Sequence, residues 1–182
     1  MEGVIESEFI RPILLGETVL PYRSLPAARA VIPRDAQGLL ESGSDRLDQY
    51  RGLAAWVRRA DECWLRHRAS ARATWLEQIN HHGKLLSQFP VRPQRVVYTK
   101  SGMHLCAARI DDRRALVDHT LYWATVRSVD EAYYLCAILN SVVVTQRVRP
   151  LMSYGKDERH IDKHIFRLPI PEFTPEQPHH AR

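Results

Sequence analysis

Residues 128–148 read SVDEAYYLCAILNSVVVTQRV, and this stretch has the least ambiguous local structure in the chain. Ser128 and Glu131 have the spacing of a capping box, in which each side chain bonds a free backbone N–H at a helix start. Asp130 adds negative charge where the helix dipole favours it. We therefore expect a helix that begins at Ser128.

An apolar stripe at three- and four-residue spacing predicts the buried face of this helix. Its members are Ala132, Leu135, Cys136, Leu139, Val142 and Val143. Asn140 and Ser141 interrupt the pattern with polar side chains, which ordinarily mark a fraying end or bond to neighbouring backbone. Why the helix would run through this pair into Thr145, Gln146 and Arg147 is a question that the local pattern leaves open.

Composition sets the size of the fold. With 182 residues and 45% hydrophobic content, the chain can bury one sizeable core. We expect one domain over residues 1–173 and a flexible tail over residues 174–182. The three cysteines are far apart, each in an apolar pattern, which indicates buried free thiols and not a disulfide framework or a zinc site. They are Cys63, Cys106 and Cys136.

Neither end of the chain suggests a membrane. No amino-terminal apolar run resembles a signal peptide, and no apolar stretch of about 20 residues could span a bilayer. We expect a cytoplasmic protein without a membrane partner.

The formal charge of +5 and the sequence pI of about 9.3 suggest an acidic partner such as nucleic acid. The excess lies in two blocks, one on each side of the capped helix. Residues 84–114 hold seven cations and two acids, and residues 141–168 hold six cations and three acids.

Helical and extended patterns are segregated along the chain. From residue 45 to residue 79, apolar residues keep helical spacing and proline is absent, which predicts a long helix or a helix pair. Its arginines favour a solvated helix face. They are Arg51, Arg58, Arg59, Arg66, Arg68 and Arg72.

After Gly83, four short β-branched and aromatic runs alternate with turn residues and predict a small, mainly antiparallel sheet. They are RVVYT (95–99), MHLCAAR (103–109), RALVD (114–118) and TLYWATV (120–126). With the helix from Ser128 packed on this sheet, we expect the α+β class.

No motif indicates a catalytic centre. The chain has no glycine-rich phosphate loop, no Gly-x-Ser-x-Gly elbow and no His-Glu-x-x-His. Asp111 and Asp112 with His119 could be the metal site of a nuclease, but two aspartates in a turn are the more ordinary reading. His160 and His164 have the spacing of helical metal ligands but lack a third ligand. We expect no cofactor, no metal and no catalysis by the chain alone.

Four segments together resemble the target-recognition domain of adenine-specific DNA methyltransferases of restriction-modification systems. VIESEFIRPILLGETVLPY (4–22) resembles its opening segment, and RVVYTKSGMHLCAARID (95–111) its paired strands with a Ser-Gly turn. TLYWATVRSVDEAYYLCAILNSVV (120–143) resembles a strand followed by a helix that ends in Leu-Asn-Ser. IFRLPIPEF (165–173) resembles the closing strand. The order and spacing of all four agree across residues 4–173.

The resemblance implies that the Leu-Asn-Ser helix is scaffold beneath the sheet and that the polar segment after it leads into loops facing double-stranded DNA. Cations there would neutralise phosphates, while Arg, Asn, Gln and Ser can read base edges in the major groove. The candidate DNA-binding residues are Lys100, Ser101, His104, Arg147, Arg149, Tyr154, Lys156, Arg159 and Lys163.

One departure from the family pattern decides what the chain would do. The Asn-Pro-Pro-Tyr/Phe motif that holds the flipped adenine is absent, as is a cofactor-binding glycine loop. The chain would be the specificity half alone, and S-adenosylmethionine would bind the catalytic domain or subunit that is its partner. The alternatives are a protein-interaction or scaffold domain that keeps the fold without binding DNA, and a metal-dependent nuclease.

Overall fold

The computed structural model describes residues 3–69, 72–102, 104–151, 165, 167–177 and 180. They divide into two compact units, of which unit 1 comprises Met1–Pro12 and Arg29–Pro90, and unit 2 comprises Ile13–Ala28 and Val91–Arg182. Helices and small sheets occur together, so the expected α+β class is confirmed. Whether residues 1–173 fold as one domain, followed by a tail, stays a prediction.

Unit 1 is built around helices. Residues 45–79 form three helices in place of one long helix or a pair: α1 (Asp45–Asp48), α2 (Arg51–His67) and α3 (Trp75–Ile79). Short 3-10 helices cover Ser7–Phe9, His81–Gly83 and Leu86–Gln88. Residues 29–31 of strand β4 (Ala28–Val31) and residues 10–12 of strand β1 (Ile10–Leu14) complete the unit.

The inner face of α2 forms the core of unit 1. Leu53 and Val57 are fully buried and pack with Leu40, Leu47 and Trp75. The outer face carries the exposed arginines expected from the sequence. They are Arg51, Arg58, Arg59 and Arg66.

Glu6 closes the amino terminus of α2. The N-cap residue, Tyr50, makes no side-chain bond there, and the Glu6 carboxylate accepts hydrogen bonds from the N–H groups of Gly52 (2.9 Å) and Leu53 (2.8 Å) instead. A side chain at position 52 would collide with the carbonyl oxygen of Val4, so only glycine permits this approach. Burial opposes ionisation of Glu6, but hydrogen bonds from its own N–H and from these two groups outweigh burial and lower its pKa.

We expect Glu6→Gln to destabilise the protein by about 0.5 to 2 kcal/mol at pH 7, because an amide interacts less strongly with the free N–H groups and the helix dipole. Because the pKa of Glu6 is lower in the folded state, its carboxylate stabilises the folded protein fully at pH values above the ordinary glutamate pKa of 4.5. This stabilisation is lost as the pH falls through the folded-state pKa. Urea unfolding midpoints should therefore converge on acidification. Glu8→Gln, at an exposed position nearby, is the control and should match the wild type throughout.

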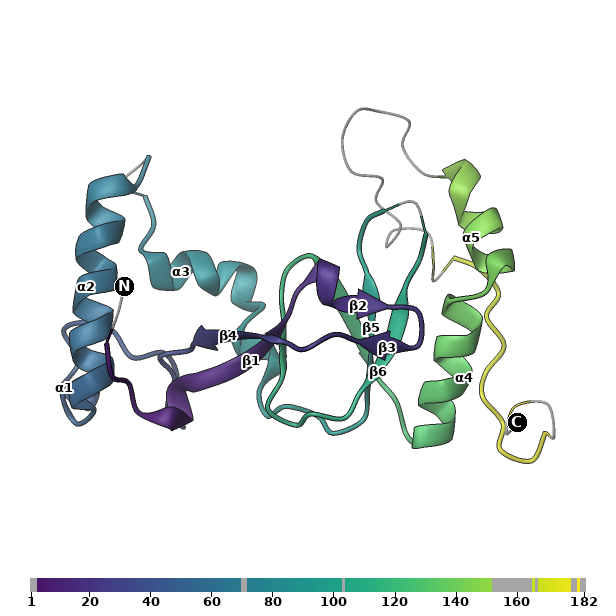
Figure 1. The fold of residues 1–182 in the computed structure, drawn as a ribbon, viewed down its shortest axis with the longest axis horizontal. Coiled ribbons are helices and arrows are strands. Elements are labelled where there is room, and N and C mark those ends of the chain that lie inside the picture. The colour runs from purple at the N-terminus through teal and green to yellow at the C-terminus, as the bar shows by residue number, and fades with distance from the viewer. Residues whose placement is uncertain are drawn as a thin grey trace. The chain divides into compact units, whose positions relative to one another are not determined.

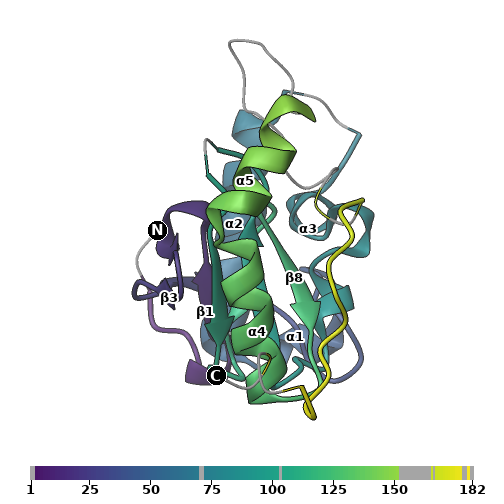
Figure 2. The same ribbon diagram turned by 90° about the vertical axis from the view of Figure 1, so that its right-hand side faces the viewer.

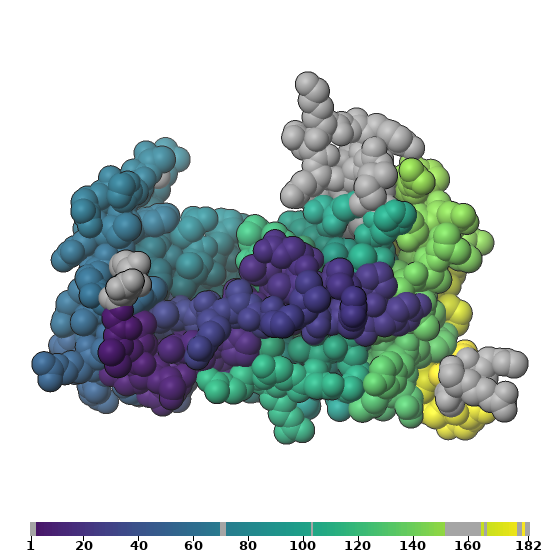
Figure 3. All heavy atoms as spheres, viewed as in Figure 1, coloured from purple at the N-terminus to yellow at the C-terminus, as the bar shows by residue number. Residues whose placement is uncertain are grey.

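Unit 2 contains the predicted antiparallel sheet, in the strand order β6–β5–β8. Strand β5 (Arg95–Thr99) pairs with β6 (Ala107–Ile110) on one side and β8 (Leu121–Thr125) on the other. The hairpin of β2 (Val19–Leu20) and β3 (Arg23–Ser24) packs on this sheet and covers it on the face seen in Figure 3.

The segment predicted as a third hairpin strand pairs elsewhere. Strand β7 (Leu116–Val117) lies parallel to the end of β1, with Ile13 opposite Leu116. Arg95, only 1% exposed, holds the turn before β7, because its Nη2 donates to the carbonyl oxygens of Asp112 (3.0 Å) and Ala115 (2.8 Å). The run through Leu116 was therefore correctly predicted as a strand, but its partner is not in the antiparallel sheet.

Alternate residues of β5 face two separate cores, as strand geometry requires. Val96 and Tyr98 face α4 (Val129–Leu139) and α5 (Val142–Val148), which lie along one side of the sheet in Figures 1 and 2. Val97 faces a second cluster. That cluster includes Leu14, Val19, Ala108, Ile110, Val117 and Leu121.

Helix α4 begins as predicted. The Ser128 hydroxyl accepts a hydrogen bond from Glu131 N–H (3.1 Å). The second half of the expected capping box is different, because the Glu131 carboxylate bonds the backbone N–H of Arg127, one residue before the cap. Glu131 also pairs with the Arg127 guanidinium (2.9 Å), which raises the pKa of Arg127 and lowers that of Glu131.

The predicted apolar stripe is right for α4 and wrong beyond it. Ala132, Cys136 and Leu139 are buried, but Val142 is 66% and Val143 54% exposed. The reason is a break in the helix at Asn140, after which the hydroxyl of Ser141 caps a new helix by accepting from Val144 N–H (3.2 Å). Because α5 starts anew after Ser141, its buried face does not continue the predicted stripe and is formed by other residues. These residues are Val144, Thr145 and Val148.

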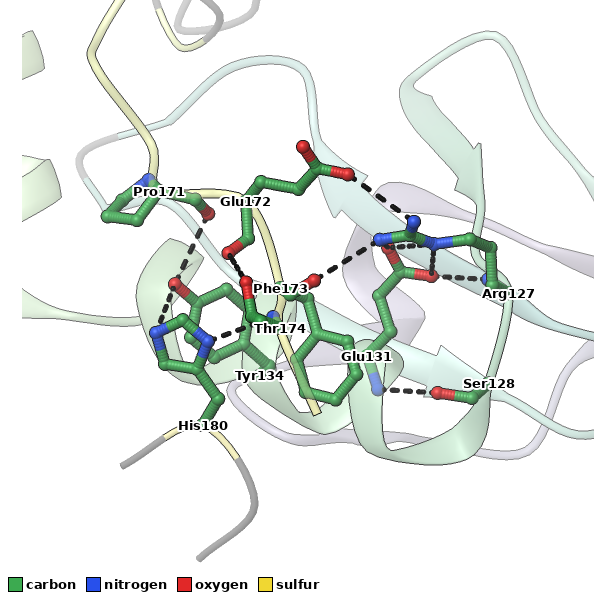
Figure 4. A network of polar contacts seen from close by, with 9 residues as sticks. All are labelled: Arg127, Ser128, Glu131, Tyr134, Pro171, Glu172, Phe173, Thr174 and His180. Atoms are coloured by element: carbon green, nitrogen blue, oxygen red, sulfur yellow. Dashed lines mark hydrogen bonds and ion pairs between the residues drawn. The ribbon is translucent and has the colours of Figure 1, made fainter. Parts of the chain in front are cut away.

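The expected closing strand is also absent, since residues 167–177 contain no strand. Pro169 and Pro171 lack the N–H groups that a ladder needs. This segment runs beside α4 and β8 in Figure 2 and is held by side chains. Tyr134 donates its hydroxyl to the carbonyl oxygen of Pro171 (3.2 Å), and Arg127 pairs with Glu172 (3.3 Å), as Figure 4 shows.

We expect Leu139→Ala to cost about 2 to 5 kcal/mol of unfolding free energy, because the side chain is fully buried against the sheet. Tyr133→Ala, at a position 56% exposed, should cost less, and Val143→Ala should be close to neutral. Denaturant unfolding measures all three. Equal losses for Leu139→Ala and Val143→Ala would contradict the change of phase at Asn140.

Candidate nucleic-acid interface

Strand order places two of the predicted recognition segments at one end of unit 2. Strand β5 ends at Thr99 and leads into the turn with Lys100, Ser101 and His104. Strand β8 runs antiparallel to β5, and α4 returns along the sheet, so α5 lies at the same end as this turn (Figure 1). His104 in the turn and Val142 at the start of α5 are 38 residues apart in sequence.

The turn after β5 has a well-bonded base. Thr99 N–H donates to the carbonyl oxygen of Cys106 (3.0 Å), and the Thr99 hydroxyl accepts from Cys106 N–H (3.1 Å). Lys100 N–H donates to the carbonyl oxygen of Thr120 (3.2 Å), and its ammonium group lies 5.9 Å from the Tyr122 ring centroid. Gly102 has a φ of 136°, which favours glycine. His104 is exposed beyond this base.

The exposed face of α5 is apolar at its start, at Val142 and Val143, and becomes basic at its end. Its sequence, VVVTQRV, contains no acid, and Gln146 and Arg147 are exposed. Arg149 follows in a 3-10 helix, Arg149–Leu151, and is also exposed. The opposite face of α5 is packed in the core, so these cations project from a fixed support.

Asn140 joins this helix pair to the sheet. Its side-chain carbonyl accepts from Ala107 N–H (2.8 Å), and its amide donates to the carbonyl oxygens of Ala107 (2.8 Å) and Cys136 (2.8 Å). The side chain thus pairs with β6 as a neighbouring strand would. The polar pair in the middle of the predicted helix is therefore not a fraying end: Asn140 fixes α4 to β6, and Ser141 starts α5.

We expect Asn140→Ala to cost about 1 to 3 kcal/mol, because it leaves the N–H of buried Ala107 without its acceptor. Asn140→Asp should be destabilising in a pH-dependent way, since its carboxylate can accept from Ala107 N–H but would repel the two carbonyl oxygens. Its carboxyl pKa should be raised on folding, so stability should fall as the pH rises through that value. Urea unfolding between pH 4 and pH 8 measures this, and a pH-independent loss would contradict the pairing. Gln146→Asp, on the exposed face of α5, is the control.

A hollow of about 280 Å³ opens beside Ser101. Asp118 lies in its wall, where it accepts from the Thr120 hydroxyl (2.9 Å) and contacts His119 Nδ1 (2.8 Å). Burial opposes ionisation of Asp118, but the bonds from His119 and Thr120 outweigh burial and lower its pKa, so the hollow contains an ionised acceptor. The lining residues are Leu15, Gly16, Glu17, Thr99, Ser101, Asp118 and Thr120.

Sequence reasoning did not find this hollow. Glu17 belongs to the opening segment and Asp118 to a turn, and nothing in the local pattern of either indicates that they line one cavity. The expected residues Tyr154, Lys156, Arg159 and Lys163 lie outside the described part of the chain, as do His160 and His164.

The three residues that could form a nuclease metal site, Asp111, Asp112 and His119, each interact with a neighbouring residue instead. Asp111 pairs with Arg109 (2.7 Å), and the Asp112 carboxylate accepts from Arg114 N–H (2.7 Å) within the turn. His119 contacts Asp118 instead of either. In the portion of the chain that the structure covers, no three potential metal ligands from His, Cys, Asp or Glu converge.

The cysteines are free, as expected, but only Cys136 is fully buried. Cys63 and Cys106 are partly exposed, so the expectation of burial is wrong for them. Burial raises the pKa of Cys136 to about 11, which leaves the thiol protonated and unreactive at neutral pH.

No protein-family model matches the sequence, and a search among curated proteins finds no match either. Within the described ranges, no helix has both the length and the apolar character that crossing a bilayer requires.

Proposed function

We propose that this chain is a sequence-specific DNA-recognition module that acts with an adenine-specific DNA methyltransferase. The observation that carries this proposal is the meeting of two basic segments at one end of unit 2. Lys100 and His104 stand on the turn after β5, and Arg147 and Arg149 on and after α5. Both supports are tied to the same sheet, which suits a surface that must hold a fixed register on a duplex.

The mixture of side chains suits both tasks of a specificity domain. Exposed cations can neutralise phosphates, and Ser101 with the polar wall of the hollow can bond base edges. A carboxylate such as Asp118 can accept from the amino group of cytosine, while an arginine can bond both acceptors of guanine. A surface of cations alone would bind DNA without selecting a sequence.

Catalysis in this proposal belongs to the partner. S-adenosylmethionine and the target adenine would bind a methyltransferase catalytic domain or subunit, and the present chain would choose the site. One feature supports this division: the Asn-Pro-Pro-Tyr/Phe motif is absent from the sequence. A cytoplasmic location is part of the same proposal.

Salt dependence tests the electrostatic part. If the surface neutralises about five phosphates, log affinity for duplex DNA should fall against log salt with a slope of about −4 to −5. Arg147→Gln and Arg149→Gln should each flatten the slope by about one unit. Arg58→Gln, which removes an exposed cation already paired with Asp48 on unit 1, is the matched control. A wild-type slope near zero would eliminate the proposal in this form.

Cognate DNA separates positioning from reading. Lys100→Ala and Lys156→Ala should weaken binding to every duplex about equally, because lysine acts on phosphate as a point charge. Arg159→Ala should cost about 1 to 3 kcal/mol on the cognate site and little on unrelated DNA, if it reads a base. Mapping methylated adenines in cells that express the chain with its catalytic partner would identify that site. Uniform losses on cognate and random DNA would leave only a nonspecific basic surface.

A protein-interaction domain is the second candidate, and one observation favours it. Helices α4 and α5 expose three large side chains with apolar surface, Tyr133, Val142 and Val143, and exposed apolar surface is typical of protein-interaction sites. If the wild-type chain binds no duplex DNA even at low salt, the protein-interaction domain becomes the favoured function.

A further inference from the structure

Two arginines of unit 1 share one aromatic ring. The guanidinium carbon of Arg34 lies 4.2 Å from the ring centroid of Phe89, and that of Arg11 lies 5.5 Å from the same centroid. Each contact falls within the range of a cation–π interaction. Two positive charges are thereby held next to one another by a neutral side chain.

The side chain of Arg34 has no polar partner among the described residues. Its Nε is buried and unbonded, and no hydrogen bond or ion pair reaches its guanidinium group there. A buried, unpaired nitrogen of this kind is uncommon in folded proteins, since arginine stays charged in all ordinary conditions. The unpaired group calls for a ligand or an ordered solvent molecule.

The carboxylate of Asp35, the residue after Arg34, pairs with a different arginine, Arg46. Both oxygens of Asp35 lie 2.6 Å from Arg46 Nη1, and Oδ1 also accepts from the N–H groups of Gln37 (2.8 Å) and Gly38 (3.0 Å). Although burial opposes ionisation, these bonds lower the pKa of Asp35. Asp35 is therefore ionised and engaged with Arg46, so it does not pair with Arg34.

The contact with Phe89 leaves the hydrogen-bonding capacity of the Arg34 guanidinium unused. It is an attraction between the positive charge and the ring, and no hydrogen bond from the Arg34 side chain is formed among the described residues. A planar fork of donors matches two oxygens of a phosphate, and the nearby charge of Arg11 favours an anion further. Two exposed arginines of unit 1 differ in this respect. Arg58 pairs with Asp48, and Arg66 donates to the carbonyl oxygen of Glu62 (3.4 Å).

We propose that Arg34, assisted by the charge of Arg11 and held by Phe89, binds a phosphate group. The group can belong to the backbone of duplex DNA or to a free phosphate compound, and the chemistry of recognition is the same. The backbone form rests on the proposed function and would give the chain a phosphate contact on unit 1, apart from the recognition surface of unit 2. The free form stands without the proposed function.

Two probes and three variants of the full chain test this site. Pyrophosphate binding is measured by calorimetry, and duplex binding by fluorescence anisotropy over a range of salt. We expect Arg34→Gln to weaken pyrophosphate binding at least tenfold and to flatten the duplex salt slope by about one unit. Arg34→Lys keeps the positive charge but loses the planar pair of N–H donors. Its affinity for each probe should therefore lie between those of the wild type and Arg34→Gln. Arg58→Gln should match the wild type with both probes.

The outcomes separate the two proposals. Pyrophosphate binding that depends on Arg34, in a chain that binds no duplex, would support this site and reject the proposed function. Arg34-dependent pyrophosphate binding with unchanged duplex binding would assign the site to a free phosphate compound. If both Arg34 variants bind both probes like the wild type, or if the wild type binds neither, the site is rejected. Circular dichroism melts show whether each variant is folded. If Arg34→Gln is not folded, the affinities of Arg34→Lys test the site instead.

Discussion

The structure of unit 2 depends on the backbone of one residue, Ala107. Its N–H and carbonyl groups are paired by the side chain of Asn140, and the same carbonyl accepts from Tyr22 N–H (2.9 Å). Because Ala107 is fully buried, none of these groups could turn to water instead. Three segments far apart in sequence are thus fixed to one point, and the position of the basic face of α5 relative to the turn after β5 follows from it.

Local signals in the sequence were reliable where the structure is local. The Ser128 cap, the run of β5 and the buried face of α4 all depend on neighbours within four residues or on simple alternation, and each was predictable. The errors arose where a distant partner decides. The sequence gives Asn140 the character of a fraying helix end because its partner is 33 residues away, and it does not indicate the break in the helix there, which changes the phase and exposes Val142 and Val143. Likewise, the sequence of β7 indicates a strand, but it does not show which strand is the partner, because the pairing depends on the position of β1.

The candidate site shows the same division. The exposure of cations such as Arg147 could be predicted from their charge alone, since a solvated side chain needs no partner. The polar wall beside Ser101 could not, because Glu17 and Asp118 come together only after β1 and β7 have paired. The contact of Arg34 with Phe89 is likewise invisible in the sequence, where 54 residues separate the two.

The division of unit 2 into residues 13–28 and 91–182 has a consequence for the chain as it leaves the ribosome. Leu14 and Val19 emerge early, yet the strands that bury them are synthesised about 100 residues later. At about 5 to 20 residues per second, this apolar segment waits on the order of 5 to 20 s without its partners. Unit 1 can meanwhile complete its own core, apart from this segment. The apolar segment around Leu14 and Val19 is therefore open to aggregation until the strands that bury it have been synthesised.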